Sequence, residues 1–413
     1  MRRQHNAVSA SAAPAPEPAH LSRRGLIARA AAGTIGLMAG PGLALPSAHA
    51  ATGSASGLTV EDLDFQAALK PVDPEQGIFG VDDTYVWCGT PIANPSGGYY
   101  LFYSRWPHGS VGRDPATEGS LFFGFSGWLK YSEVAVAWSP SRRGPYRHVR
   151  TLLTGTGDES RWDRFCAHNP HVRRFGDRYY LYYIANNPLN TPEPWLSQQP
   201  TTWLRYHAGQ RIGVVVADSL ADLVEGRGRR SEHPIVAPDY VNTFQMVVNP
   251  SVTTMPDGRF LMTYKTWNAA KAYVNVVAIA ESPEGPFVYQ GVALEKELQA
   301  EDPYVWYDGE RARFFAIVKD YYAGADRTKA LTPQFGALGL VESTDGLKWR
   351  PAANPVVSLR TLRLSTDETW TLERLERPQL LLGEDGVPDM LHAAMSVGPP
   401  ADGTQNVAIP LRF

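Results

Sequence analysis

The sequence predicts an all-β protein, a single five-bladed β-propeller. One short pattern recurs five times: polar residues, a Pro, an aromatic or β-branched run, a tight turn and a second apolar run. The composition agrees, because 37 Gly, 33 Pro and 11% aromatic residues in 413 favour short strands joined by turns. Few stretches show the long apolar periodicity of helices.

The clearest copy of the pattern spans residues 301–318. Glu301 and Asp302 stand directly before Pro303, at the start of the run Tyr304-Val305-Trp306. A turn at Asp308-Gly309 leads to a second apolar run, 314–318. This order predicts a strand, a turn and a strand, with two carboxylates where the first strand begins.

Aligning the copies on their Pro residues gives the positions 91, 170, 250, 303 and 378, with spacings of 79, 80, 53 and 75. Each copy offers about four strands, and four-stranded units repeated radially are typical of a propeller. The fifth copy lacks a clear fourth strand, so we expect a strand within residues 58–69 to complete it and close the ring. The alternative is a β-sandwich whose hairpins resemble one another by accident.

The N-terminal 50 residues read as an export signal. Arg23-Arg24 forms a twin-arginine pattern, residues 25–45 are weakly apolar, and Ala48-His49-Ala50 is typical of a signal-peptidase site. We therefore expect 1–50 to be a twin-arginine signal peptide and 51–413 to be the propeller, periplasmic or secreted. The alternatives are a disordered Ala/Pro tail and a membrane anchor, which Arg29 argues against by interrupting a short run.

Charge and cysteine content narrow the functional classes. Without residues 1–50 the chain has 34 Lys and Arg against 41 Asp and Glu, and such a mildly acidic protein is a poor nucleic-acid binder. Cys88 and Cys166 stand before equivalent strands of neighbouring copies, so a disulfide bond and two buried free thiols both remain open. Their spacing does not fit a metal or redox motif.

Polar residues at the start of each first strand are the candidate site. The first strands of the blades line the central channel, so their starts gather at one mouth although they lie far apart in sequence. A mouth with carboxylates, amides and aromatic rings suits a sugar, because hydrolysis needs an acid and a base or nucleophile. The candidate catalytic carboxylates are Asp302, Glu301, Asp83 and Glu376. The candidate substrate-binding residues are His168, Asn169, Asn249, Trp87, Arg105, Trp106, Lys265, Trp267, Lys319, Asp320 and Arg377.

Each candidate also has a structural interpretation. Asp302 can cap the turn before Pro303, and Glu376 can form a local ion pair with Arg377. His168 can satisfy a backbone carbonyl. The Trp side chains can serve packing alone.

The motifs His168-Asn169-Pro170, Asn249-Pro250-Ser251-Val252, Glu301-Asp302-Pro303 and Glu376-Arg377-Pro378, each followed by an aromatic hairpin, carry a family resemblance. From about Asp82 to its end the chain resembles the five-bladed propeller glycoside hydrolases around family 43, with families 32, 68 and 117 as relatives in fold. The resemblance implies hydrolysis of exposed glycosidic linkages in plant or algal polysaccharides. It also implies three carboxylates at the channel mouth: a base, an acid and one that tunes and orients.

The chain departs from that family at the site. Family 43 usually has Asp at the first-strand start of its first two blades and Glu in the third, whereas those starts here read Gly89-Thr90, His168-Asn169 and Asn249. The acidic starts lie in the fourth and fifth copies, so this chain is expected to be a divergent member whose substrate cannot be transferred.

These observations predict a secreted glycoside hydrolase that uses one of Asp302 and Glu301, with Asp83 and Glu376 as candidate partners. A separation of about 6.5–9.5 Å between the two carboxyl groups would indicate inversion, and one of about 5–5.5 Å retention. No organic cofactor is implied, and a structural cation in the channel stays open. The alternatives are a non-catalytic carbohydrate-binding propeller, and a sugar transferase or phosphorylase, which Lys265, Lys319 and Arg377 converging on one spot would favour.

Overall fold

The computed structural model describes residues 62–109, 121–294 and 299–413. The chain divides into two units, Met1–Leu58 and Thr59–Phe413, and every strand among the described residues belongs to the second. The twin-arginine segment, residues 1–50, lies outside the described residues.

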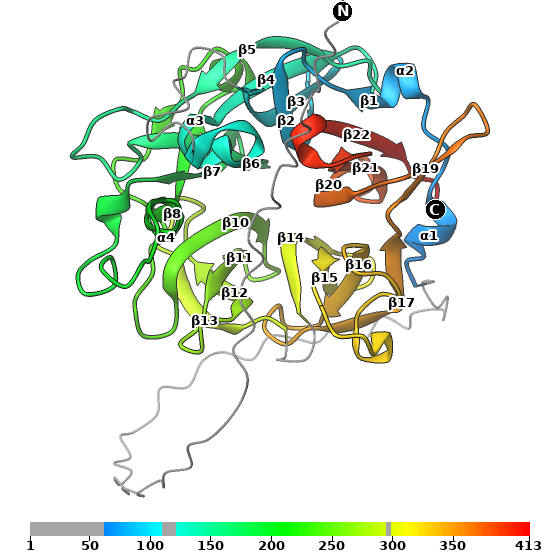
Figure 1. The fold of residues 1–413 in the computed structure, drawn as a ribbon. Coiled ribbons are helices and arrows are strands. Elements are labelled where there is room, and N and C mark those ends of the chain that lie inside the picture. The colour runs from blue at the N-terminus through cyan, green and yellow to red at the C-terminus, as the bar shows by residue number, and fades with distance from the viewer. Residues whose placement is uncertain (1–61, 110–120, 295–298) are drawn as a thin grey trace, which may run out of the picture. The chain divides into compact units, whose positions relative to one another are not determined.

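Five four-stranded antiparallel sheets stand in a ring, which confirms the predicted five-bladed propeller (Figure 1). Blade 1 consists of β2 (Thr84–Ala93), β3 (Tyr99–Pro107), β4 (Glu133–Ser139) and β5 (Arg147–Leu153). Blade 2 consists of β6 (Phe165–Phe175), β7 (Arg178–Asn186), β8 (Gln210–Ala217) and β9 (Arg229–Arg230). Blade 3 consists of β10 (Phe244–Thr254), β11 (Phe260–Trp267), β12 (Tyr273–Ala280) and β13 (Val288–Val292).

The last two blades follow the same order, except that the outermost strand of blade 5 comes from the start of the chain. Blade 4 consists of β14 (Ala300–Asp308), β15 (Arg313–Asp320), β16 (Leu338–Ser343) and β17 (Arg350–Ser358). Blade 5 consists of β20 (Arg374–Leu382), β21 (Pro388–Ser396), β22 (Gln405–Pro410) and β1 (Ile78–Phe79). A two-stranded ribbon, β18 (Thr361–Arg363) and β19 (Thr369–Thr371), joins them.

The helices are short and lie in the connections. In the described ranges they are α1 (Phe65–Ala68), α2 (Pro74–Gly77), α3 (Trp128–Tyr131), α4 (Thr202–Ala208), α5 (Leu220–Val224) and the 3₁₀ turns η2 (Gly124–Gly127), η3 (Pro188–Asn190), η4 (Arg327–Lys329) and η5 (Pro400–Asp402). Across the described ranges, none of these helices has the length and apolar character needed to cross a membrane.

Separate hydrophobic clusters fill the interfaces between adjacent blades. At the interface of blades 1 and 2, for example, Phe102 and Val136 pack with Val172 and Leu181. Strands buried on both faces read as nearly continuous apolar runs, and this is why the inner strands lack clean alternation. The ring is therefore stabilised by sheet-on-sheet packing.

A strand from the start of the chain closes the ring, as predicted, but it is not the predicted one. Ile78 pairs with Val407 of β22, and Phe79 stacks edge-on against Tyr103 of blade 1 at 4.9 Å between ring centroids. The expectation of a strand within residues 58–69 was wrong for its described part. There Asp64 accepts a hydrogen bond from the Ala67 N–H and starts the helical turn α1.

All five innermost strands carry an irregularity at the same place. In each blade the pairing with the second strand shifts register there, and one residue adopts a positive φ: Cys88 (56°), Asn169 (51°), Asn249 (60°), Asp302 (59°) and Arg377 (55°). In blades 2–5 the next residue is Pro, which lacks an N–H and is tolerated where the ladder is interrupted. The recurring Pro therefore marks the bulge of each inner strand.

Blade 1 has Gly89 instead of Pro at this place, so the alignment on Pro91 was wrong by two residues. Pro91 lies in the regular ladder opposite Leu101. The Gly89 N–H donates to Asn406 Oδ1 at 2.9 Å, which a Pro could not do. A Cβ on Gly89 would lie 2.9 Å from the side chains of Asn406 and Leu101, so any larger residue would force these side chains to move.

Candidate functional site

The five bulge residues meet at the channel and form a polar ring. The Cys88 thiol donates to Asn169 Oδ1, Asn169 Nδ2 donates to Asn249 Oδ1 at 2.5 Å, and Asn249 Nδ2 donates to Asp302 Oδ1 at 2.6 Å. The backbone N–H of Arg377 donates to Asp302 Oδ2 at 3.3 Å, and its guanidinium lies 3.7 Å from Asp302 Oδ1. One residue from every blade thus forms the floor of the site.

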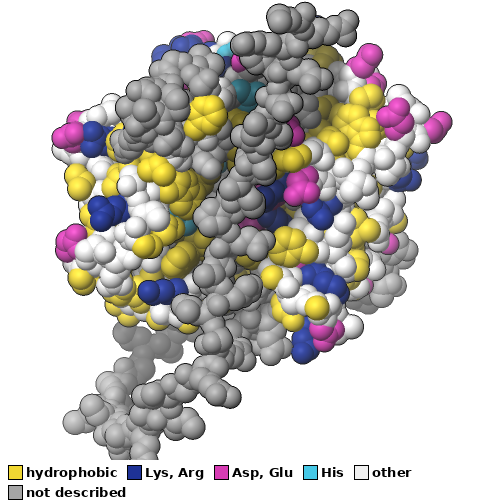
Figure 2. Space-filling view, in the orientation of Figure 1, with side chains coloured by type: hydrophobic (Ala, Val, Ile, Leu, Met, Phe, Trp, Pro, Cys, Tyr) yellow, Lys and Arg dark blue, Asp and Glu magenta, His cyan; other side chains and the backbone are white. Residues whose placement is uncertain are grey.

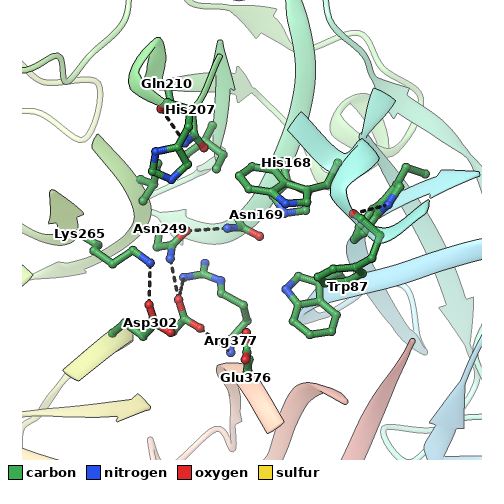
Figure 3. Close-up of a pocket in the computed structure, with 16 residues that line it drawn as sticks. Trp87, His168, Asn169, His207, Gln210, Asn249, Lys265, Asp302, Glu376 and Arg377 are labelled. Carbon is green, nitrogen blue, oxygen red and sulfur yellow. Dashed lines mark hydrogen bonds and ion pairs between the residues drawn. The ribbon is translucent and has the colours of Figure 1, made fainter. Parts of the chain in front are cut away.

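A cavity of about 150 Å³ lies over this ring and is lined by residues from all five blades. On the face viewed in Figure 2, basic and acidic side chains lie next to one another near the centre and hydrophobic side chains flank them. Figure 3 shows the polar lining residues converging on one space. The cavity is lined by Trp87, Trp106, Phe125, Trp128, His168, Asn169, Ile184, His207, Gln210, Val248, Asn249, Lys265, Glu301, Asp302, Glu376 and Arg377.

Lysines from two second strands hold the glutamates on one side of the cavity. Glu301 accepts from Lys265 Nζ and from Lys319 Nζ, each at 2.7 Å. Lys319 Nζ also donates to Glu376 Oε1 at 2.6 Å, and Arg374 Nη1 lies 3.0 Å from the same oxygen. Lys319 thus bridges blades 4 and 5, and its ammonium group links the two glutamates.

The same network separates the pKa values of the carboxyl groups. Burial alone would raise the pKa of Glu301, but the attraction of Lys265 and Lys319 outweighs it and holds the pKa well below its usual range. Burial likewise opposes a low pKa for Glu376, and Lys319 with Arg374 overcomes it. The pKa of Asp302 is raised, first by burial and then by the negative charge of Glu301. Two carboxylates are kept ionised beside one that binds a proton more readily.

The wall opposite the glutamates is aromatic and uncharged. His168 Nδ1 and the Ser132 hydroxyl are 2.8 Å apart, and the His168 ring stacks on Trp128 at 4.8 Å between centroids. Burial, and then the positive charge of Arg377, place the pKa of His168 well below its ordinary value, so the ring is neutral. On the blade 1 side of the cavity, Trp87 packs edge-on against Phe125.

Most of the residues expected at the site from the sequence are brought together there. Lys319 joins the cluster through its two glutamate contacts, and Lys265 lines the cavity directly. The other expected residues that line it are Asp302, Glu301, Glu376, His168, Asn169, Asn249, Trp87, Trp106 and Arg377.

Four expected residues lie elsewhere. Asp83 is exposed in the turn between β1 and β2, and Arg105 pairs with Glu133 at 2.6 Å. Trp267 packs edge-on against Tyr273, outside the cavity lining. Asp320 is fully buried, and its carboxylate accepts from the Thr332 and Tyr322 N–H groups, so it holds the connection that follows β15.

Several lining residues had no sequence prediction because they come from connections between the second and third strands. Phe125 and Trp128 precede β4 in blade 1, while His207 and Gln210 precede or begin β8 in blade 2. The signal was present in the blade lengths, since blades 1 and 2 are longer than blade 3 and the extra residues are rich in aromatics.

The two cysteines are free and buried. Cys88 belongs to the polar ring, and Cys166 Sγ lies 3.3 Å from Asn186 Nδ2. Burial raises the pKa of Cys166 to about 12. Of the two interpretations left open by the sequence, the structure therefore shows two free thiols.

The described ranges contain no cluster of three or more His, Cys, Asp and Glu side chains that could hold a metal ion.

Comparisons with known proteins agree with the fold. No protein-family model matches the chain, and no curated protein matches it in sequence. Among solved structures, the chain is similar to Zg3597, a family 117 glycoside hydrolase of the marine bacterium Zobellia galactanivorans, with 14% identity and a TM-score of 0.51 over 84% of this chain and 89% of that one.

Two further structures resemble the chain to a similar degree. One is the BT0996 RGII complex, with 10% identity and a TM-score of 0.54 over 84% of this chain and 93% of that one. The other is a protein of unknown function from Dyadobacter fermentans, with 11% identity and a TM-score of 0.51 over 84% of this chain and 100% of that one. The chain thus shares the five-bladed propeller architecture on which such glycoside hydrolases are built, at a sequence distance that makes it a divergent example of that fold.

Proposed function

We propose that this protein is a glycoside hydrolase that removes a terminal sugar from a poly- or oligosaccharide by paired-carboxylate catalysis. The observation that carries the proposal is a small cavity lined by three tryptophans and three carboxylates, of which Glu301 and Asp302 are buried and Glu376 is 12% exposed. Its volume of about 150 Å³ is below the range of about 300–1,000 Å³ typical of drug-sized ligands. A single sugar ring, rather than an extended chain, matches that space.

The carboxylates divide into roles through their pKa values. Asp302, whose pKa is raised, is the proposed general acid that protonates the leaving oxygen. Glu376, whose pKa is lowered, is the proposed base or nucleophile. Glu301, fixed by two lysines, is the proposed third carboxylate, which orients the lysines and raises the pKa of Asp302.

Two structural features support the alternatives. The carboxylates come from the neighbouring strands β14 and β20 rather than from opposite sides of the channel, which favours a carbohydrate-binding propeller without hydrolysis. Lys265 and Arg377 line the cavity and Lys319 pairs with two of its glutamates, which favours a transferase or phosphorylase that uses phosphate as acceptor. The lysines, however, are already paired with glutamates.

A release assay separates these functions. The protein expressed from the full sequence is incubated with neutral and anionic plant, algal and bacterial-wall polysaccharides and their oligomers, with and without inorganic phosphate. We expect release of a monosaccharide without phosphate. Binding without release would indicate the lectin-like alternative, and release only with phosphate would indicate a phosphorylase. Export to the periplasm or medium is part of the proposal, and N-terminal sequencing of the mature protein tests it, with Ala51 as the expected first residue.

A further inference from the structure

Arg377 is buried in a way that leaves its guanidinium without an oxygen acceptor at hydrogen-bond distance. Its side chain is 2% exposed, and within the described part of the chain its Nε, Nη1 and Nη2 atoms have no hydrogen-bond partner. Its contacts are the ion pair with Asp302 at 3.7 Å and the neighbouring Cys88 thiol. Burying a charged donor without acceptors destabilises the folded protein. Arg377 therefore does not owe its position to fold stability alone.

Arg211 shows what a structural arginine looks like in the same protein. It is equally buried, at 3% exposed, in β8 of blade 2. Its guanidinium donates to the carbonyl oxygens of Ala208, Gln210, Gln245 and Asn190, at 2.6–3.0 Å. Arg211, which serves packing, thus has carbonyl acceptors for its guanidinium, whereas Arg377 at the cavity lacks them.

The other cations around the cavity have closer carboxylate partners than Arg377 has. Lys265 and Lys319 share Glu301, and Lys319 and Arg374 share Glu376. Those pairs are 2.6–3.0 Å long, whereas Arg377 lies 3.7 Å from Asp302, so Arg377 is the least closely paired cation of this cluster. The third carboxylate, Asp302, is the one whose pKa is raised, and its protonation would leave the guanidinium still less compensated.

Further unpartnered polar atoms border the same space. His207 Nδ1 and Gln210 Oε1 are buried and, within the described ranges, lack hydrogen-bond partners. Both residues line the cavity, and Figure 3 shows them across it from Arg377 and Asp302. Burial, and then Lys265, lower the pKa of His207 to about 3, so its ring is neutral and suits hydroxyl groups rather than an anion. The anion-binding end of the cavity is therefore the Arg377 end.

We propose that the cavity takes a sugar ring with an anionic substituent, a carboxylate or a sulfate ester, and that Arg377 receives this anion. Guanidinium groups bind both substituents through paired N–H donors. His207 and Gln210 then bind ring hydroxyls on the other side. The inference rests on the proposed function for the statement that the ligand is a sugar, and it narrows that function to acidic glycans.

The test compares pairs of sugars that differ only in the group at C6, which is neutral in one member and anionic in the other. Binding of glucuronate against glucose, galacturonate against galactose, and galactose 6-sulfate against galactose is measured by saturation-transfer NMR and calorimetry with the full-length protein. We expect the acidic member of at least one pair to bind about tenfold or more tightly, as one charge-assisted hydrogen bond implies. The pair that shows the preference distinguishes a uronic acid from a sulfated sugar.

Variants locate the preference. Arg377→Met should bring the acidic-to-neutral ratio close to one, Arg377→Lys should retain part of it, and Arg211→Met should leave it unchanged even if the protein is less stable. A ratio within one preparation does not depend on the fraction of folded protein. Equal binding of both members of every pair by the wild type, no binding of any sugar, or a ratio unchanged in Arg377→Met would overturn the inference.

The outcomes for this inference and for hydrolysis are independent. Acidic sugars that bind without any glycan being cleaved would support the anion site and remove the hydrolase. Neutral glycans cleaved as fast as acidic ones would keep the hydrolase and remove the anion site. Inorganic phosphate that binds more tightly than every acidic sugar and is needed for release would assign Arg377 to a phosphate acceptor and overturn the inference.

Discussion

Asp302 and Arg377 occupy the same position in neighbouring blades, and their charged groups lie 3.7 Å apart over the centre of the channel. Both residues have a positive φ, 59° and 55°, at the bulge of their inner strands. Left-handed backbone at such residues costs about 1–3 kcal/mol each and tends to persist at functional sites. The repeated bulge is thus what brings an acid and a cation from separate blades into one polar ring.

Lys319 should stabilise the fold through the two glutamates that it bridges. Removing one partner of a buried ion pair typically costs about 3–5 kcal/mol, so we expect Lys319→Met to lower the free energy of unfolding by about that amount at pH 7. The pKa values of Glu301 and Glu376 are depressed below the ordinary 4.5, so their stabilising contribution is present above that pH and is lost as pH falls toward the folded-state pKa values.

The difference in the free energy of unfolding between wild type and Lys319→Met should therefore be largest above about pH 5 and should become smaller below about pH 4.5. Urea unfolding at a series of pH values from neutral to about pH 3 measures it. Lys329→Met is the control, because Lys329 is 65% exposed and its ion pair with Asp326 is long, at 3.8 Å. We expect this substitution to change the free energy of unfolding by less than about 0.5 kcal/mol. If the difference in unfolding free energy between wild type and Lys319→Met does not change with pH, the glutamates are not stabilised by Lys319.

Glu376 should control the acid side of the pH–rate profile. Its pKa is lowered from the ordinary 4.5, which keeps it ionised above that pH, so we expect kcat/KM of the wild type to fall only below it. Glu376→Gln should lose about 10²–10⁴-fold in kcat, and the residual activity should lack this acid limb. Glu384→Gln, a position in the turn between β20 and β21, is the control. Full activity in Glu376→Gln would exclude Glu376 as base or nucleophile.

Trp87 should contribute to substrate binding more than to chemistry. It lines the cavity and packs against Phe125, so we expect Trp87→Ala to raise KM about 5–30-fold with a smaller change in kcat. Trp138→Ala is the matched control, because Trp138 lies on β4 and is 37% exposed. Steady-state kinetics of sugar release separate an effect on KM from an effect on kcat. A change confined to kcat would place Trp87 outside the binding wall.

The two thiols should behave as free and buried groups. We expect both Cys88 and Cys166 to be alkylated in urea without reductant, and to react slowly in the native protein because burial raises both pKa values. Mass spectrometry of the alkylated chain counts them, and the melting temperature should not change with reductant. Protection of both thiols in urea until reductant is added would demonstrate a disulfide bond.

The sequence was enough to predict the propeller because the same bulge recurs in every inner strand. The Pro after Asn169, Asn249, Asp302 and Arg377 marks a place where the ladder needs no N–H, so it is visible without coordinates. The alignment on Pro missed the bulge of blade 1. Gly89 occupies the place of the Pro there, because its N–H donates to Asn406 and a side chain would crowd Asn406 and Leu101.

The ion pairs and the part of the aromatic wall that comes from connections could not be predicted in the same way. Lys319 meets Glu376 across 57 residues of sequence, and only the angle between blades 4 and 5 brings them together. Trp128 and His207 lie in connections whose path depends on the packing of helices α3 and α4, and no strand periodicity reports it. Arg105 and Asp320 were expected at the site because they end second strands, yet both are satisfied by partners within their own blades.

The most direct test of the central claim compares Asp302→Asn with Asp83→Asn in the release assay. Asn at 302 is nearly isosteric and can still accept from Asn249, but it loses the acceptor of the Arg377 N–H and cannot transfer a proton. Asp83 is a carboxylate control that is exposed in a turn. We predict that Asp302→Asn lowers the rate of sugar release about 10²–10⁴-fold at a temperature where the variant is still folded, and that Asp83→Asn leaves the rate unchanged. Release that survives at the wild-type rate in Asp302→Asn would contradict the assignment of this cavity as the catalytic site.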